Sequence, residues 1–490
     1  MKAFRSLLWI FSFCFLISSC SQQEQKQNST PNILLIVSDD HGSADMSSLG
    51  RLADVQTPHL DELAQSGIRF TEAHASSPIC SPSRMAIMTG VHHQRFGTYW
   101  YGGKGIHDEQ YPTIAELLKT KGYASGYIGK VHYGSGQFDA DPEHRNFPLN
   151  HGFDYFFGHT SARKHYLRHS DEEEEAFIAL KEELNRQGQT LRKQSFWRNK
   201  KKVDTMSFST QMIGNEARAF IEKHQEDPFF LQVSFNAVHN FTHQLPASYL
   251  AEKGLKGYHD WDPNTEEYYD WYQKGRYPNN PEGREQYLGQ LYYLDQEIGK
   301  LMQSLEDLGL REETLVIYIA DNGGSTPIYA NNTPLRGSKY VLYEGGIKVP
   351  LIVSYPGQIA ADQVLSNWVS AMDILPSICS FTGIEKPKIL DGLDLYPLLK
   401  GEDMSIGHDT LFFDTGHERA IKTSNWKWHE ASNDRSAIYE MVELELGAYL
   451  RNLQEDVGEK EDYSEVESQQ AEDLKQALEH WQKRIKAKSQ

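Results

Sequence analysis

The sequence predicts an α/β fold built on a largely parallel sheet. Short apolar runs at 33–37, 123–128, 229–235 and 315–319 alternate with segments of helical periodicity, which is the pattern of βαβ units. Two of these runs end in Asp39-Asp40 and Asp321-Asn322, and open α/β sheets place ligands at the carboxyl ends of their strands. With 490 residues, 39% of them hydrophobic, the chain has room for two or three domains with ample core.

The first residues have the features of an export signal. Lys2 and Arg5 precede an apolar run at 7–13 that is too short to span a bilayer. The run ends in Leu16-Ile17-Ser18-Ser19-Cys20, which resembles a bacterial lipobox and would make Cys20 the lipid-modified first residue of the mature chain. Residues 21–30 are polar and aperiodic, as in a tether. We expect an exported lipoprotein at the outer membrane, facing the periplasm or the cell surface, with a plain secretory signal as the alternative.

The net charge limits the classes of binding partner, and the cysteine content bears on disulfide formation. The formal net charge of −19 argues against a nucleic-acid partner and requires a locally positive pocket for any anionic substrate. Of the four cysteines, Cys14 leaves with the signal and Cys20 is the anchor, so no disulfide framework is expected. Cys379 follows an apolar run and is predicted to be core; pairing with Cys80 is the less favoured alternative.

The first strand, 33–37, ends in Ser38-Asp39-Asp40-His41-Gly42. Adjacent carboxylates repel each other unless a cation or solvent relieves them, so Asp39 and Asp40 are candidate metal ligands. Capping or turn duty for one of them is the alternative. The next element is a helix with Thr57 as its cap and Pro58 at its first position, which Gly67 ends.

A cysteine between two prolines opens the following helix. Pro78 and Pro82 flank Cys80, and Pro82 suits a first helical turn, where its missing N–H costs nothing. Cys80 would therefore lie at a helix N-terminus, where unpaired amides favour an anion. Arg84, one turn later, would face the same ligand as a planar fork. A buried turn cysteine is the plainer alternative.

The motif Cys80-Ser81-Pro82-Ser83-Arg84 resembles the signature of type I sulfatases, in the alkaline phosphatase superfamily. In that family a formylglycine-generating enzyme oxidises the cysteine, and the hydrated aldehyde attacks the sulfur of a sulfate ester. The resemblance continues in five separated blocks from residue 31 to about 400. It implies a large, mostly parallel sheet sandwiched by helices and a smaller C-terminal subdomain of antiparallel sheet and helix.

The same resemblance assigns the basic residues. A helix at 113–121 feeds the strand 123–128, which leads into Gly129-Lys130-Val131-His132. If this segment is extended, Lys130 and His132 point to one side. The resemblance places Lys130 on the sulfate and His132 on the formylglycine; surface placement is the alternative.

The general acid is expected beyond the strand 229–235, which a helix at about 210–224 precedes. His239 of Asn236-Ala237-Val238-His239 matches the family histidine that contacts the sulfate and protonates the leaving oxygen, a role suited to an imidazole. Because Val238 stands where the family usually has Pro, His243 is its nearest substitute.

A second pair of oxygen donors follows a long helix from about 282 and the strand 315–319. Asp321 and Asn322 offer hard ligands that suit calcium, and with Asp39, Asp40 and the modified Cys80 they are the family's ligands for one Ca²⁺ ion. Zinc is disfavoured because no His or Cys cluster has its spacing. In the segment 332–339, Lys339 matches the second sulfate-binding lysine, although Ser338 replaces the usual glycine.

Four segments are open to more than one interpretation. Residues 171–175 are predicted to be a solvated acidic helix face and 198–202 a basic counterpart, with polyanion binding as a weak alternative. The segment 152–158 is read as packing. The aromatic segment 251–282 either stacks on sugars or pins a long insertion.

These observations divide the chain into a signal (1–20), a tether (21–30), a catalytic domain (31–405) and a C-terminal subdomain (406–490), in which 419–428 is expected to be strand and 471–486 helix. The predicted function is calcium-dependent, formylglycine-based hydrolysis of a sulfated carbohydrate. The alternatives are a phosphodiesterase or phosphonate monoester hydrolase of the same superfamily, and a non-catalytic glycan-binding lipoprotein.

Overall fold

The structure is a computed structural model that describes residues 30–134, 141–160, 166, 196–203, 207–257, 265, 270, 280–432, 442 and 444–488. The predicted signal, nearly all of the predicted tether, the acidic run 171–175 and most of the aromatic segment lie outside the described residues. Among the helices that the structure describes, none combines the length and apolarity needed to cross a membrane.

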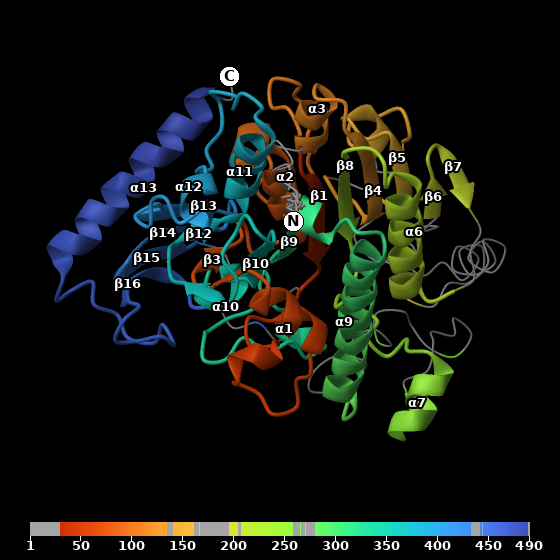
Figure 1. The fold of residues 1–490 in the computed structure, drawn as a ribbon. Helices are drawn as coiled ribbons and strands as arrows, with labels where there is room; N and C mark the ends of the chain where they lie inside the picture. The colour runs from red at the N-terminus through yellow and green to blue at the C-terminus, as the bar shows by residue number, and fades with distance from the viewer. Residues whose placement is uncertain are drawn as a thin grey trace, which may run out of the picture.

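A ten-stranded sheet forms the centre of the molecule (Figure 1). Its strands, in spatial order, are β11 (Gln363–Leu365), β2 (Ile68–Phe70), β10 (Leu351–Ser354), β9 (Thr314–Ala320), β1 (Asn32–Ser38), β8 (Phe229–Ser234), β4 (Ala124–Lys130), β5 (Tyr155–His159), β6 (Phe196–Arg198) and β7 (Lys201–Val203). The five strands from β9 to β5 are parallel, and β1 lies between β9 and β8, with Ile33 paired with both Phe230 and Leu315. The predicted α/β class with a mostly parallel sheet is confirmed.

Helices cover both faces of this sheet because β1 is apolar on both sides. Ile33, Leu35 and Val37 pack in one core and Leu34 and Ile36 in the other, as expected for a strand buried between two layers. The first core includes side chains of α2 (Cys80–Thr89), α3 (Ile114–Lys119), α11 (Ile374–Thr382) and α12 (Tyr396–Leu399). The second takes α1 (Pro58–Gln65), α6 (Ser209–Lys223) and α9 (Gly283–Asp307), and Figure 1 shows the two groups on opposite sides of the strands.

Smaller elements complete the fold. They are α7 (Ala247–Lys253), α10 (Glu344–Ile347) and a parallel pair formed by β3 (Ala73–His74) and β12 (Val369–Ser370). Thr113 caps α3 in a full capping box with Glu116, whereas Thr57, the predicted cap of α1, lies at the N-cap position without a capping hydrogen bond from its side chain. The segment 152–158, read from the sequence as packing, contains the first residues of β5, so that interpretation missed a strand.

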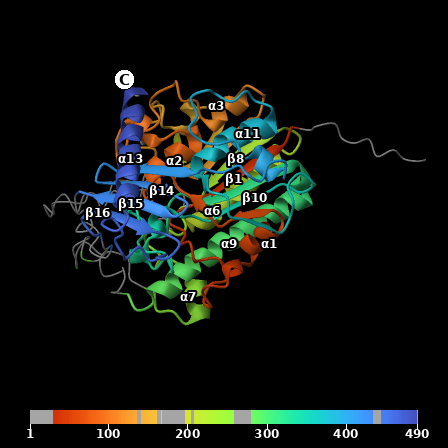
Figure 2. The same ribbon diagram turned by 90° about the vertical axis from the view of Figure 1, so that its left-hand side faces the viewer.

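The C-terminal part is an antiparallel sheet of β13 (Thr410–Asp414), β14 (Glu418–Thr423), β15 (Trp426–Ala431) and β16 (Gly447–Asn452), covered by α13 (Ser468–Lys488). The apolar stripe of α13, including Leu474, Leu478 and Trp481, packs on this sheet, and Figure 2 shows the helix lying along it. The prediction of one strand over 419–428 is wrong. The chain turns at 424–425, and β14 and β15 form a hairpin.

Candidate active site

Three strands bring the predicted site residues to one edge of the sheet. Asp39 and Asp40 directly follow β1, Lys130 ends β4, and Asp321 and Asn322 directly follow β9. These strands are parallel, so their carboxyl ends meet at the same edge. Gly129 permits the close fit next to Lys130: its φ is +112°, and a Cβ there would lie 1.9 Å from the carbonyl oxygen of Ser234.

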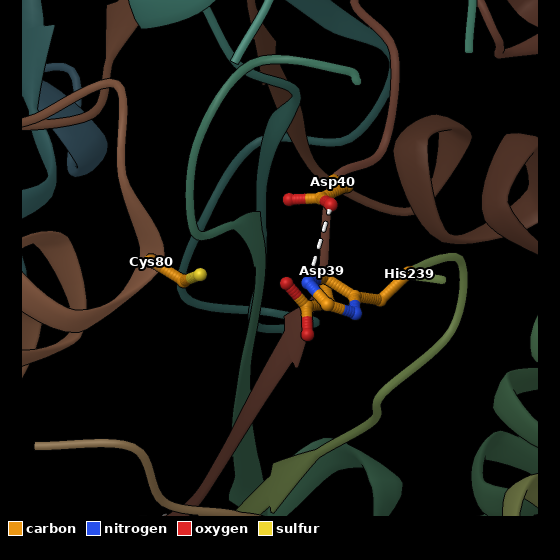
Figure 3. Close-up of side chains that lie close together, drawn as sticks. All are labelled: Asp39, Asp40, Cys80 and His239. Atoms are coloured by element: carbon orange, nitrogen blue, oxygen red, sulfur yellow. Dashed lines mark ion pairs between the residues drawn. The ribbon is translucent and has the colours of Figure 1, made fainter. Parts of the chain in front are cut away.

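Cys80 faces this edge from the first turn of α2, as the sequence predicts. Ligand atoms of Asp39, Asp40, Cys80 and His239 all lie within 4.8 Å of one another, and all four side chains are buried. Figure 3 shows the Cys80 side chain directed toward the two carboxylates, with the His239 ring beside them. Burial raises the pKa of the Cys80 thiol despite the nearby lysines, so the unmodified cysteine is a thiol and a poor nucleophile.

Each aspartate holds one lysine. Lys130 forms a buried ion pair with the Oδ2 atom of Asp39, and the Nζ atom of Lys339 lies 2.7 Å from the Oδ1 atom of Asp40. Neither lysine side chain is exposed to solvent. Two buried ammonium groups therefore lie at the site, and each is paired with one of the two aspartates whose ligand atoms are close to Cys80.

Arg84 is fixed by the protein around it. Its Nε atom donates to the Oδ2 atom of Asp321 at 2.7 Å, and its Nη1 atom donates to the Lys130 carbonyl oxygen at 3.0 Å and to the Ser234 Oγ atom at 2.6 Å. Its Nη2 atom has no hydrogen-bond partner among the described residues and lies 3.7 Å from the Oδ2 atom of Asp39. Arg84 thus ties Asp321 to the end of β4, and its Nη2 atom alone remains for the ligand that the sequence analysis expected it to face.

The two adjacent aspartates have opposite pKa shifts. Burial would raise the pKa of Asp39, but Lys130, Arg84 and Lys339 outweigh it and lower the pKa to about 2. Burial, reinforced by Asp39 and Asp321, raises the pKa of Asp40 to about 7 even though Lys339 opposes the shift. Burial and Asp39 also raise the pKa of Asp321 against the effect of Arg84. Crowded carboxylates of this kind bind a cation readily because it relieves their mutual repulsion.

Unpartnered oxygen atoms mark where a cation fits. The Oδ1 atoms of Asp39 and Asn322 are buried and have no hydrogen-bond partner among the described residues, and both belong to hard oxygen ligands of the kind calcium takes. Asp321 lies beside them, with its Oδ1 atom accepting from the Asp40 amide at 3.3 Å. Asp39, Asp40 and Asp321 are matched in charge by Arg84, Lys130 and Lys339. A divalent cation would make the site net positive, as binding of a sulfate ester requires.

His132 reaches the site by a different backbone path from the one expected. Strand β4 ends at Lys130, and His132 has a φ of +55°, so the segment from Gly129 to His132 is not extended as the sequence analysis supposed. The imidazole is buried, and its Nδ1 atom has no hydrogen-bond partner among the described residues. Burial, together with Lys130 and Arg84, lowers the pKa of His132 well below its usual value. A neutral ring at this place can accept a proton.

His239 follows β8 in a tight turn and lies nearer the carboxylates than expected. Its Nε2 atom is 3.7 Å from the Oδ2 atom of Asp40, so it belongs to the candidate cation cluster as well as to the predicted acid position. His243, its proposed substitute, is buried in the same loop but is absent from that cluster. The structure therefore favours His239 over His243 as the histidine at the reaction centre.

The C-terminal sheet holds the segment that carries Lys339. Glu344 begins α10, five residues after Lys339, and pairs with Lys422 at 2.5 Å and Lys427 at 3.2 Å, both from that sheet. Lys427 is paired in turn with Glu459 at 2.8 Å, and all of these groups are buried. Removing any one charge would leave its partners buried and uncompensated.

The sequence analysis missed three residues that shape the site. Ser234 ends β8 and accepts from Arg84. His41 is hydrogen-bonded through Nδ1 to the Tyr318 hydroxyl at 2.6 Å and through Nε2 to the Asp45 carbonyl oxygen at 2.7 Å, which fixes the turn after Asp40. The Tyr101 ring is stacked 6.1 Å from that of His132. The aromatic run Tyr99-Trp100-Tyr101 was the signal that could have revealed Tyr101.

The fold and the site together define an α/β enzyme in which a buried cysteine at a helix N-terminus faces paired carboxylates at the strand ends, a donor set that can hold a metal ion. The chain matches the family model for sulfatases over residues 31–384, and the C-terminal model of N-sulphoglucosamine sulphohydrolase over residues 338–484. It belongs to the sulfatase family and is a sulfuric ester hydrolase. Sulfatases generally use a formylglycine and a metal ion.

Relatives of known name agree with this assignment. Arylsulfatase A of Bos taurus is 30% identical over 82% of this chain and 75% of its own length. The N-acetylgalactosamine-6-O-sulfatase of Bacteroides thetaiotaomicron is 26% identical over 98% of this chain and 99% of its own. The crystal structure of Ps i-CgsB in complex with k-i-k-neocarrahexaose matches with a TM-score of 0.73 and 26% identity, covering 92% of this chain and 93% of that one.

Proposed function

We propose that this sulfatase hydrolyses sulfate esters of a sulfated carbohydrate, with a formylglycine derived from Cys80 and one bound calcium ion. The observation that carries the proposal is the placement of Cys80: a buried thiol at a helix N-terminus, within 4.8 Å of ligand atoms of Asp39, Asp40 and His239. The raised pKa of this thiol explains why the residue would need conversion before it could attack an ester. A formylglycine supplies a hydroxyl nucleophile from its hydrated aldehyde.

Calcium would be held by Asp39, Asp40, Asp321 and Asn322, together with residue 80. The unpartnered oxygen atoms of Asp39 and Asn322 support this ligand set, and all four side chains offer the oxygen ligands that calcium prefers. The ion would polarise a bound sulfate ester and withdraw negative charge from the reacting group.

The basic residues have separate duties in this proposal. Lys130 and Lys339 neutralise the sulfate oxygens, since both are buried ammonium groups at the strand-end edge. His239 donates a proton to the leaving oxygen, and the neutral His132 accepts one when the enzyme is regenerated. Arg84 holds Asp321 in place through its 2.7 Å contact.

The substrate class rests on two comparisons and on the site's charge. The N-acetylgalactosamine-6-O-sulfatase aligns with nearly the whole chain, and Ps i-CgsB was crystallised with k-i-k-neocarrahexaose. Both names refer to carbohydrates, and the two buried ammonium groups of Lys130 and Lys339 suit the sulfate group of such a substrate. An external sulfated glycan also fits an exported lipoprotein anchored through Cys20, which is the location we propose.

The deciding experiment is the mass of the tryptic peptide that carries Cys80, from protein co-expressed with a formylglycine-generating enzyme. We expect the thiol mass to be replaced by that of an aldehyde reactive toward hydrazide. An intact cysteine, in cells where a control sulfatase is converted, would favour a glycan-binding protein without catalysis.

Substrate assays then separate the two enzyme classes. Matured protein should release sulfate from sulfated oligosaccharides, and calcium should be found bound in about one equivalent by elemental analysis. A higher kcat/KM on phosphate diesters or phosphonate monoesters than on any sulfate ester would make the protein a phosphoryl hydrolase of the superfamily instead.

A further inference from the structure

A hollow lies between the catalytic part and the C-terminal sheet, away from Cys80. Its volume is about 870 Å³, within the range of roughly 300–1,000 Å³ typical of small-molecule sites. Tyr99 forms the wall on the catalytic side, and the other side comes from β13 to β16 and α13, with Asp414, His417, Arg419, Glu430 and Gln482 as its polar lining. None of these residues belongs to the site around Cys80.

The polar lining is held in place by its own hydrogen bonds. The Nε2 atom of Gln482 donates to the Oδ2 atom of Asp414 at 2.7 Å, and the Nη1 atom of Arg419 donates to the Oε1 atom of Gln482 at 2.8 Å. Arg419 is also paired with Glu430, which accepts from the Trp428 indole at 2.8 Å. Planar groups fixed in this way lose little conformational entropy when they bind a ligand.

The charge of the hollow selects against a second sulfate. Asp414 and Glu430 place two carboxylates beside the single guanidinium of Arg419, so the lining has no excess of positive charge. Carboxylate, amide and guanidinium groups side by side both accept and donate hydrogen bonds. This combination matches an uncharged sugar, whose neighbouring hydroxyl groups do the same.

Aromatic rings connect the hollow to the reaction centre. Tyr101 is stacked on His132 at 6.1 Å, Trp100 contacts Tyr101 at 5.8 Å, and Trp100 meets His417 edge-on at 5.6 Å. The rings of Tyr101, Trp100 and His417 thus form a continuous path from His132 to the lining of the hollow. Ring faces suit the C–H faces of sugars, and the polar edges of Tyr and Trp suit their hydroxyl groups.

We propose that this hollow is a distal subsite for an uncharged sugar residue. The substrate is then an oligosaccharide whose sulfated residue lies at Cys80, while a further residue of the same oligosaccharide occupies the hollow. The inference rests on the proposed function and narrows its substrate to sulfated glycans in which uncharged residues alternate with charged ones. Binding energy from the distal residue holds the sulfate ester at the reaction centre.

The test compares kcat/KM for substrates of increasing length. Mono-, di-, tetra- and hexasaccharides of a κ-carrageenan series and of a keratan sulfate series with unsulfated galactose, in both of which uncharged residues alternate with sulfated ones, are assayed beside 4-nitrophenyl sulfate, which carries no sugar residue to occupy the hollow. We expect the wild type to gain at least tenfold between the shortest and the longest member of a hydrolysed series. Glu430→Gln and Tyr99→Ala should each reduce that gain below threefold and leave 4-nitrophenyl sulfate turnover unchanged. Glu472→Gln, an exposed glutamate of α13 outside the hollow, is the matched control and should retain the gain.

The outcomes distinguish failure of the distal subsite from failure of the proposed sulfatase activity. A wild-type kcat/KM that does not change with chain length, a full gain in both variants, or turnover of 4-nitrophenyl sulfate alone would overturn the distal subsite and leave the sulfatase activity standing. Matured protein that releases sulfate from none of the substrates would instead overturn the proposed function. Having two variants guards against loss of folding in one of them, which thermal unfolding would reveal.

Discussion

Arg84 and Asp321 form the buried pair on which the site's geometry depends. Their side chains are 1% and 0% exposed, so replacing Arg84 leaves the Asp321 carboxylate beside Asp39 in the interior without its guanidinium partner. Because the pKa of Asp321 is raised even with Arg84 present, we expect Arg84→Met to lower the free energy of unfolding by about 3–5 kcal/mol, measured by urea titration without added calcium. Ser234→Ala removes one hydrogen bond to the same guanidinium and keeps both charges, so it should cost about 1.5–3 kcal/mol. Equal losses for the two variants would mean that Arg84 does not neutralise Asp321.

His239 has two candidate roles that kinetics can separate. A general acid matters most when the leaving group is poor, so His239→Ala should lower kcat/KM for an alkyl sulfate by about 10²–10⁴ and that for 4-nitrophenyl sulfate far less. A metal ligand matters for both substrates. Because the Nε2 atom of His239 is 3.7 Å from Asp40, equal losses on both, accompanied by weaker calcium binding, would assign it to the metal instead. His243→Ala, in the same loop, controls for disturbance of the loop itself.

At the scale of elements, a histidine joins the start of the C-terminal sheet to the catalytic part. The Nε2 atom of His408, two residues before β13, lies 2.9 Å from the Oδ1 atom of Asp373, which precedes α11. Burial lowers the pKa of His408, but Asp373 outweighs burial and the net shift is upward. A pKa raised in the folded state adds stability that is fully present below the unfolded value of 6.5 and is lost as the pH rises through the folded value.

His408→Gln should remove this pH dependence, since a glutamine amide can still donate to Asp373 but does not titrate near neutrality. We expect the free energy of unfolding of the wild type, relative to the variant, to fall between pH 6 and pH 9. Urea titrations across that range measure the difference, which cancels the contributions of all other titrating groups. A difference that stays constant with pH would show that the pKa of His408 is the same in the folded and the unfolded protein.

The accuracy of the sequence analysis differed between elements for physical reasons. Apolar runs located β1, β4, β8 and β9 to within two residues, because a strand buried on both faces must be continuously apolar. β5, in the segment read as packing, went unrecognised because glycines flank its short apolar stretch. The β14–β15 hairpin was taken as one strand because its turn at 424–425 contains no glycine or proline.

The sequence predicted those residues of the candidate site that follow the ends of strands or belong to the local motif around Cys80. Asp39, Asp40, Lys130 and Asp321 are brought together by parallel pairing, which sequence order alone implies. The contact of Arg84 with Asp321 and the stacking of Tyr101 on His132 were not predictable, because they join residues distant in the chain. The same holds for the buried charges of Glu344, Lys422 and Lys427, which appear in the sequence as ordinary surface residues.

At the scale of the whole molecule, the direction of β1 sets where a tether from Cys20 would join the sheet. The chain enters β1 at Asn32 and leaves it at Ser38, directly before Asp39 and Asp40, so the entry point lies at the sheet edge opposite the site. Thr30 and Pro31 line a hollow at that far edge with Arg311 and Glu313, which flank the start of β9. A lipid on Cys20, as proposed, would therefore be joined to the protein at the end of the sheet opposite the catalytic edge. The ten residues 21–30 reach at most about 35 Å at roughly 3.5 Å per residue.

The chain enters β1 at the end away from the candidate active site, so under the proposed lipid anchor at Cys20 location and activity should separate in one variant. Cys20→Ser should move the protein from the membrane fraction to the soluble fraction, and the kcat/KM of the purified protein for a soluble sulfate ester should stay within a factor of two of the wild type. Cys14→Ser changes the other cysteine of the signal and should leave the protein in the membrane fraction. Fractionation with a sulfate-release assay measures both. A Cys20→Ser protein that still sediments with membranes would contradict the anchor, and one that is soluble but has lost activity would contradict the independence of the catalytic edge from the membrane.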